Sequence, residues 1–188
     1  MYILFFNIIW MIWNILLAFL GVWFSWALNK VESRFAKILL FFPWLLIVPN
    51  TIYIVTDSIH LRWELPEVSG IRLILVIFQF AIFIPLGVVT YYVSMRFFEQ
   101  GVRRLWEELT LKKINFNLFI VLINFAIAYA VAMGRFARTN SWEVISDPWR
   151  VVRDIFAILT SPNTIVFVLI FGVFANILYF GMRRLFHK

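Results

Sequence analysis

The sequence predicts an all-α polytopic membrane protein, and three observations support this: the composition, the long uncharged segments and the distribution of basic residues. Of the 188 residues, 63% are hydrophobic and only 14% are charged, and the mean hydropathy is +0.90. A soluble domain is about 45–50% apolar and about 25% charged, so the composition excludes a soluble globular fold. The chain has no Cys, which excludes disulfides and thiolate chemistry.

Five segments are long and apolar enough to cross a bilayer, which takes about 20 residues of helix. The first, residues 2–28, carries no charge. It is longer than the apolar region of a signal peptide, which has about 7–15 residues, so we expect it to be retained. The other four predicted spans are residues 35–59, 73–95, 116–133 and 164–182.

The Lys and Arg residues in the connections between these spans predict the orientation. Eleven lie on the side that holds the C-terminus, and six lie on the opposite side. Because cytoplasmic connections are enriched in Lys and Arg, we expect a cytoplasmic C-terminus and an outside N-terminus, in the cell membrane. The net charge of +7 is then a topology signal, and we expect no nucleic-acid partner.

Two of the connections have helical patterns of their own. Residues 148–160 follow Asp147, and Asp before Pro is typical of a helix start. Their apolar residues recur at helical spacing: Trp149, Val152, Phe156 and Leu159. We expect an amphipathic helix on or in the outer leaflet. Residues 97–111 are predicted either as a cytoplasmic interfacial helix or as a simple extension of the third span.

The sharpest polar feature lies near the end of the second span, in the stretch PNTIYIVTDSIH. Four of its side chains fall within an arc of roughly 80° on a helix that turns about 100° per residue. These four are Asn50, Tyr53, Asp57 and His60. Pro49 is expected to begin this helical piece, because proline lacks the backbone N–H that would continue a preceding helix. A broken span that presents polar side chains is a common way to build a binding site in a membrane.

Asp57 and His60 are one helical turn apart, so the carboxylate can hydrogen-bond to the imidazole. Such a contact orients the ring and raises its basicity, which makes His60 a candidate acid/base and Asp57 its orienter. Alternatively, both could bind a metal ion, with Glu64 or Glu67 as the nearest third ligand. They could also simply cap the span at the outer interface. The sequence identifies no cofactor.

A second polar stretch, GRFARTNSW at residues 134–142, is predicted on the same outer side. Arg135 and Arg138 are one turn apart and could hold one anion between them, because guanidinium groups bind phosphate and carboxylate through paired hydrogen bonds. Alternatively, both are anchors at the membrane surface. Asn140, with Glu143 three residues later, is typical of a helix N-cap.

Amide side chains also occur within the predicted spans, at Asn7, Asn14, Gln79, Asn124 and Asn176. Amides in spans usually join helices through hydrogen bonds, and we expect that role here. Those predicted in the outer half or near the middle of the membrane, Asn14 among them, could also line a polar pocket that opens outward.

Three stretches resemble a bacterial integral-membrane family, domain-of-unknown-function family 1361. They are WNILLAF (13–19), WLLIVPNTIYIVTDSIHL (44–61) and GRFARTNSW (134–142), in the order that the family has them. The pattern PN-x-x-Y-x-x-TD-x-x-H is the specific one of the three. The resemblance groups one set of candidate site residues: Asn14, Asn50, Tyr53, Asp57, His60, Arg135, Arg138, Asn140 and Trp142. It implies no activity for them.

Three classes of function fit these features. The first is an enzyme that acts on an anionic lipid or lipid-linked substrate at the outer face, with Asp57 and His60 as the catalytic pair and the other grouped residues binding substrate. The second is a structural or assembly subunit that binds a partner membrane protein or a second copy of itself. A small transporter is less favoured, because no ionisable residue lies in the middle of a predicted span. Membrane lipids are expected partners.

Overall fold

The computed structural model describes residues 2–108 and 115–186 of the chain. The regular elements within these residues are helices, which confirms the all-α prediction. Five helical segments among them are long and apolar enough to cross a membrane: Ile3–Lys30, Arg34–Glu67, Ile71–Glu107, Phe116–Ala137 and Pro162–Phe186. They match the five predicted spans in order, so the chain is a multi-pass membrane protein.

The outer surfaces of these helices are apolar. Phe5, Ile74 and Phe78, for example, each remain more than 60% exposed. Soluble proteins rarely expose apolar surface on this scale, whereas a lipid bilayer matches it.

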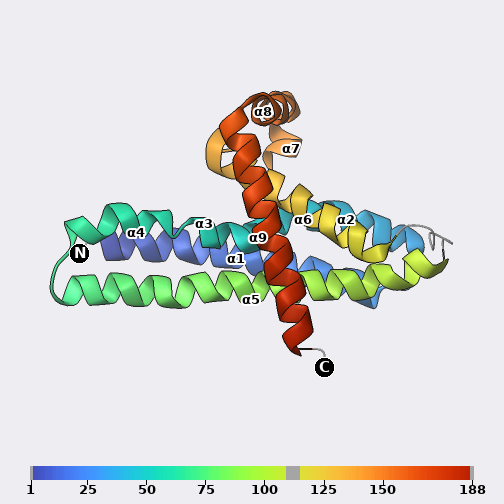
Figure 1. Ribbon diagram of the computed structural model, residues 1–188, viewed down its shortest axis with the longest axis horizontal. Coiled ribbons are helices and arrows are strands. Elements are labelled where there is room, and N and C mark those ends of the chain that lie inside the picture. Colours follow the sequence, from blue (N-terminus) through green and yellow to red (C-terminus); the bar gives the residue numbers. More distant parts are fainter. Residues whose placement is uncertain (1, 109–114, 187–188) are drawn as a thin grey trace.

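Helices α1 (Tyr2–Lys30) and α5 (Ile71–Glu108) lie side by side along the longest axis of the molecule (Figure 1). Helix α5 runs without a break through residues 97–108, so this segment extends the third span and the alternative of a separate interfacial helix is wrong there. The reason is packing: Phe98 is fully buried and stacks on Trp44, with ring centroids 3.8 Å apart. Residues 109–111 of the predicted segment lie outside the described residues.

The second span is built from three consecutive helices, α2 (Arg34–Ile47), α3 (Pro49–Thr56) and α4 (Ile59–Glu64), followed by a 3-10 turn, Leu65–Glu67. The break before Pro49 was predicted. The second break, between Thr56 and Ile59, was not, and it separates Asp57 from the helix that carries His60.

Two glycines let the other helices approach α5 closely. A Cβ at Gly87 would lie 2.6 Å from Cβ of Ile54 on α3, and one at Gly101 would lie 2.8 Å from Cα of Asn29 on α1. Small residues at such contacts allow backbones to pack tightly in a membrane. This packing holds α3, with its polar stripe, at a fixed position on α1 and α5.

Amide side chains join helices, as predicted. Asn124 on α6 (Phe116–Ala132) donates to Oδ1 of Asn176 on α9 (Pro162–Phe186) at 3.0 Å and accepts from the Tyr91 hydroxyl at 2.8 Å. Gln79 on α5 donates to the Leu4 carbonyl of α1 at 3.1 Å. Helix α9 packs mainly on α6 and crosses α5 rather than running along it (Figure 1).

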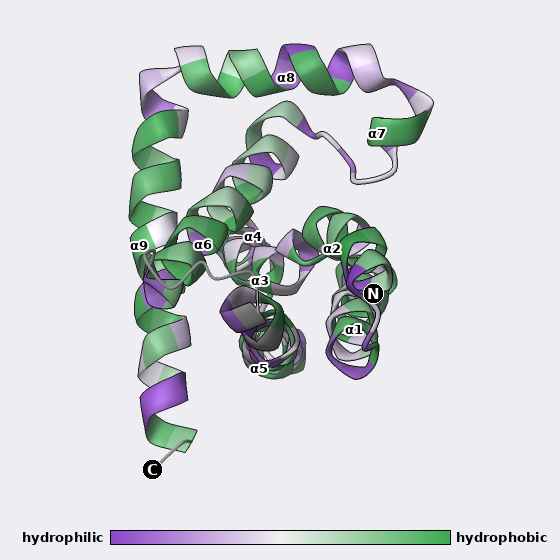
Figure 2. Cartoon of the chain, turned by 90° about the vertical axis from the view of Figure 1, so that its right-hand side faces the viewer, coloured by the Kyte–Doolittle hydropathy of each residue, from purple (hydrophilic) through white to green (hydrophobic). Residues whose placement is uncertain are grey.

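The connection between α6 and α9 contains a short π-helix (Met133–Ala137), α7 (Glu143–Ser146) and α8 (Pro148–Thr160). Asp147 caps α8 by accepting from the Arg150 N–H at 3.0 Å, as predicted. Helix α8 lies across the end of α9 (Figure 2). Its predicted apolar stripe points away from the protein, with Trp149 78% and Phe156 62% exposed, as a helix on a membrane surface requires.

Candidate functional site

The two polar stretches meet at a cavity of about 780 Å³ between α1, α3, the end of α6 and the connection to α8. Most of its wall is apolar, from residues such as Phe6, Leu17 and Ala130. Eight of the nine grouped residues line it: Asn14, Asn50, Tyr53, Asp57, His60, Arg138, Asn140 and Trp142. The ninth, Arg135, is not part of this lining but contacts Asp57, which is. Residues 14, 50–60 and 135–142, far apart in the sequence, thus form one site.

Asp57 is the buried charge of the site, with 2% of the residue exposed. The Asn14 amide donates to its Oδ2 at 3.1 Å, and Nη1 of Arg135 lies 3.5 Å from its Oδ1. This pairing compensates a carboxylate that would otherwise be costly to bury. Asn14 therefore serves the site directly by holding Asp57.

The predicted hydrogen bond between Asp57 and His60 is not formed. Nε2 of His60 lies 4.0 Å from the Asp57 carboxylate, beyond hydrogen-bonding distance. The cause is the unpredicted break after Thr56, which removes the regular helical turn that the prediction assumed. The His60 ring packs instead against Trp10, with centroids 5.1 Å apart, and its side chain is 45% exposed.

Arg135 and Arg138, which were predicted to hold one anion together, have different surroundings in the structure. The π-helix ends between them, and Arg138 adopts a left-handed backbone conformation, with φ of 54°. Arg135 turns to Asp57, whereas Arg138 is exposed and lines the cavity. In the part of the chain that the structure describes, no carboxylate pairs with the Arg138 guanidinium.

Hydrogen bonds attach the connection after Arg138 to the break in the second span. The Ser141 hydroxyl donates to the Leu46 carbonyl at 2.6 Å, and the Asn50 amide donates to the Ser141 hydroxyl at 3.4 Å. The Asn50 amide also donates to the Ile47 carbonyl at 2.9 Å, at the end of α2. Asn50 is therefore partly a structural link between the two polar stretches.

Asn140 forms only part of the predicted helix cap, and Trp142, grouped with the binding residues, also packs on α1. The Asn140 side chain does not cap α7; its backbone N–H donates to the Glu143 carboxylate at 2.8 Å, the reciprocal half of a capping box. Trp142 makes an edge contact with Trp13 of α1, with ring centroids 6.4 Å apart. The Tyr53 ring packs against Gly134, where an added Cβ would lie 3.4 Å away.

The alternative metal site is not formed. Glu64 accepts a hydrogen bond of 2.6 Å from Asn7, and no group of three or more His, Asp or Glu residues in the described ranges is arranged to hold a metal ion. Glu64 and Glu67 do not line the cavity.

The structure contains a second charged cluster, which the sequence pattern had not been used to predict. Glu99 on α5 is buried and ion-paired with Arg96, Arg103 and Arg183. The signal was present, because an acid flanked by Arg three residues before and four residues after can pair with both along one helix face. These arginines had been interpreted as topology charges alone.

The fold and the cavity together define a class: an all-α, multi-pass membrane protein with an apolar-walled cavity that carries its polar groups on a broken span and the connection opposite it. The family model described as protein of unknown function (DUF1361) matches residues 13–178. The chain therefore belongs to that family, as the three stretches had suggested. No curated protein and no solved structure matches it.

Proposed function

We propose that the protein binds an anionic amphiphile, a lipid or lipid-linked molecule, in the cavity of about 780 Å³ and acts on its head group. The pattern of charge pairing carries this proposal. Arg135 compensates Asp57, whereas Arg138 lines the same cavity without a carboxylate partner in the described part of the chain. An uncompensated guanidinium beside an apolar wall is suited to a phosphate or carboxylate attached to an acyl chain.

The shape and lining of the cavity support an amphiphile. Pockets for small ligands have volumes of about 300–1,000 Å³ and mainly apolar walls with a few polar groups that fix orientation. Here the apolar wall includes Phe6, Trp10 and Leu17, and an acyl chain would lie against it. The Tyr53 hydroxyl has no hydrogen-bond partner within the described residues, so it remains available to a ligand.

His60 is the proposed acid/base. Its imidazole lines the cavity, is half exposed and makes no hydrogen bond in the described ranges. Imidazole accepts and donates protons near neutral pH, which suits proton transfer to or from a bound head group. Asp57, 4.0 Å away and paired with Arg135, would act on His60 through its charge and not as a hydrogen-bonded orienter.

We place the cavity at the outer face of the cell membrane, with the N-terminus outside and the C-terminus cytoplasmic. The support is the excess of Lys and Arg in the connections on the side that holds the C-terminus. The exposed apolar stripe of α8, beside the cavity, would then lie in the outer leaflet, the source of the ligand.

The test compares Arg138→Gln with Arg153→Gln, each purified as the full chain. Both lose one positive charge from the predicted outer side, but Arg153 is an exposed residue of α8 that does not line the cavity. We expect the first variant to bind a short-chain phosphatidylglycerol at least tenfold more weakly than wild type, and the second to bind normally. Equal affinities for all three proteins would refute the anion contact.

Turnover is tested separately with His60→Gln, which keeps a polar side chain of similar size. We expect this variant to bind the short-chain lipid normally but no longer to convert it, with the conversion measured by mass spectrometry. Undiminished conversion by His60→Gln would refute the acid/base role. If wild type binds lipid but converts none, the binding site stands and the catalytic role is refuted.

A further inference from the structure

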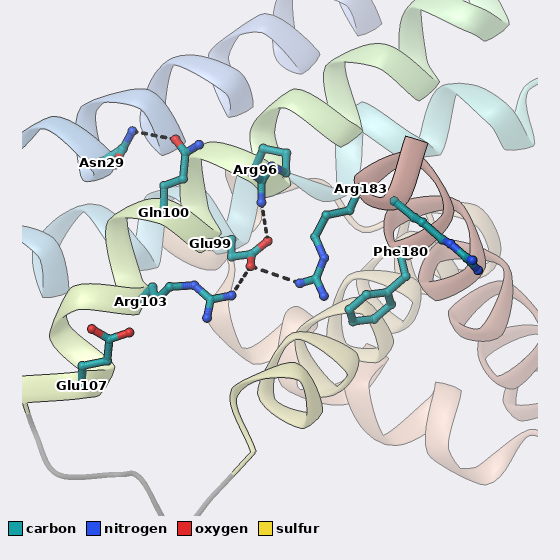
Figure 3. A pocket seen from close by; sticks show the side chains of 9 residues that line it. Asn29, Arg96, Glu99, Gln100, Arg103, Glu107, Phe180 and Arg183 are labelled. Atoms are coloured by element: carbon teal, nitrogen blue, oxygen red, sulfur yellow. Dashed lines mark hydrogen bonds and ion pairs between the residues drawn. The ribbon is translucent and has the colours of Figure 1, made fainter. Parts of the chain in front are cut away.

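A second cavity, of about 940 Å³, lies between the C-terminal parts of α1, α5 and α9 (Figure 3). It shares no lining residue with the first cavity. Six charged residues line it: Arg96, Arg103, Arg183 and Arg184, with Glu99 and Glu107. The lining therefore holds four arginines and two glutamates.

Glu99 is the centre of this cluster and is 2% exposed. Nη1 of Arg96 lies 2.8 Å from its Oε2, and Nη1 of Arg183 lies 3.1 Å from its Oε1. Arg103 and the Tyr179 hydroxyl also donate to it. Three guanidinium groups from two helices thus converge on one carboxylate (Figure 3).

One carboxylate cannot neutralise this cluster. A carboxylate has about four lone-pair sites, and all are used by these four donors. Each guanidinium has five N–H groups. Arg183 also donates to Oδ1 of Asn117, at 3.1 Å from Nη1 and 3.2 Å from Nη2, so the donors that remain for other acceptors lie mainly on Arg103. Arg184 also lines the cavity and has no ion pair within the described residues.

The arginines are held in place before any ligand arrives. The guanidinium of Arg103 lies 4.6 Å from the Phe116 ring centroid, and that of Arg183 lies 4.8 Å from the Phe180 centroid. Glu99 draws both toward one point. The side chains nevertheless stay accessible, with Arg103 46% and Arg183 25% exposed.

We propose that this second cavity binds a phosphate group, carried either by an anionic lipid head group or by a free phosphorylated solute. Glu99 is the positioning residue that gathers the guanidinium groups, and the surplus charge on Arg103, Arg183 and Arg184 binds the phosphate oxygens. A purely structural ion pair needs one arginine, and collecting further charges around it is unfavourable unless an anion compensates them. Basic pockets between membrane helices bind phospholipid head groups in this way.

The experiment measures binding by calorimetry to the full chain in detergent, using two probes, inorganic pyrophosphate and dioctanoyl phosphatidylglycerol. All proteins carry Arg138→Gln, which weakens binding in the first cavity and leaves it the same in every variant compared. We expect Arg184→Gln and Arg103→Gln each to weaken binding about tenfold or more. Arg72→Gln is the matched control and should leave the affinity unchanged, because Arg72 is exposed in the first turn of α5, the helix that carries Arg103.

A gain of affinity provides the sharper test. Glu107→Gln removes a negative charge from the lining, so it should tighten binding about threefold. A merely structural cluster would not respond in this way. Arg184 has no partner to lose in the described ranges, so its variant should melt at the wild-type temperature.

The two probes distinguish the sources of the phosphate. Pyrophosphate binding that depends on Arg103 and Arg184 supports a solute, and binding of the short-chain lipid alone supports a head group. The proposal is overturned if neither probe binds at millimolar concentration. It is equally overturned if both arginine variants bind as the control does.

Discussion

Replacing Arg135 by Gln should destabilise the protein, because it leaves the Asp57 carboxylate buried without its cation. Breaking a buried ion pair from one side costs about 3–5 kcal/mol. Two features favour the lower end, about 3 kcal/mol. The Arg135 side chain is 21% exposed, and Asn14 still donates to Asp57 after the change.

The converse change, Asp57→Asn, should cost less. It removes the buried charge itself, the new amide can still accept from Asn14, and Arg135 can reach water. We expect about 1 kcal/mol for Asp57→Asn and about the same for the double variant, which restores neutrality. The coupling between the two positions is then about 3 kcal/mol.

The assay is thermal unfolding of the four proteins in one detergent, without ligand. For a chain of this size, 1 kcal/mol corresponds to about 2–4 °C, so Arg135→Gln should melt about 6–12 °C lower and the double variant should recover most of that loss. Arg153→Gln is the control for the lost charge and should leave the melting temperature unchanged. Additive effects of the two single changes would refute the pairing of Asp57 with Arg135.

Three further predictions concern the fold and its orientation. Gly87→Ala places a Cβ against Ile54 and should cost about 1–3 kcal/mol by overpacking. Its control, Gly181→Ala, has no atom within 4 Å of the added Cβ and should be neutral or stabilising. Equal melting temperatures of the two variants would contradict the close approach of α3 to α5. Ser94→Ala leaves the buried Trp44 indole N–H without its acceptor and should cost about 1–3 kcal/mol in the same measurement. A reporter that works only in the cytoplasm should be active when fused to the C-terminus, and one that works only in the periplasm should be inactive there. The opposite result would contradict the proposed orientation.

The residues around the first cavity could be grouped from the sequence because helical periodicity is local. Asn50, Tyr53 and Asp57 are three or four residues apart, so their sharing one helix face follows from the geometry of α3. Two signals in the sequence also suggested that this face meets residues 134–142. One is the family resemblance, and the other is that both stretches are predicted on the same side of the membrane.

The partners of the charges could not be predicted in the same way. Arg135 could have bound an anion together with Arg138, but it contacts Asp57 instead. That choice depends on the π-helix and on where α6 ends relative to α3, and both are decided by tertiary packing. The break after Thr56 could not be predicted, because no proline or glycine occurs there in the sequence. The Glu99 cluster likewise needs α9 to cross α5, since Arg183 comes from another helix.

The backbone at Arg138 connects the stability of this site to its function. Arg138 is the one non-glycine residue with positive φ among those described, and a left-handed conformation costs a residue with a Cβ about 1–2 kcal/mol. The arginine makes no ion pair in the described ranges that would repay this cost. Its backbone carbonyl accepts from Arg150 at 3.4 Å, but its guanidinium has no carboxylate partner in that part of the chain. Strained backbone at such a position is expected where the side chain serves a ligand.

Arg138→Asn should therefore separate the two properties. Asparagine tolerates the left-handed region far better, so the variant should be as stable as wild type or up to about 1 kcal/mol more stable, while its affinity for the short-chain lipid falls. Arg138→Ala is the matched comparison, because it loses the same guanidinium but keeps the strain; it should lose affinity without gaining stability. If Arg138→Asn instead melts well below wild type, the arginine is holding the connection together, and its assignment as the ligand contact fails.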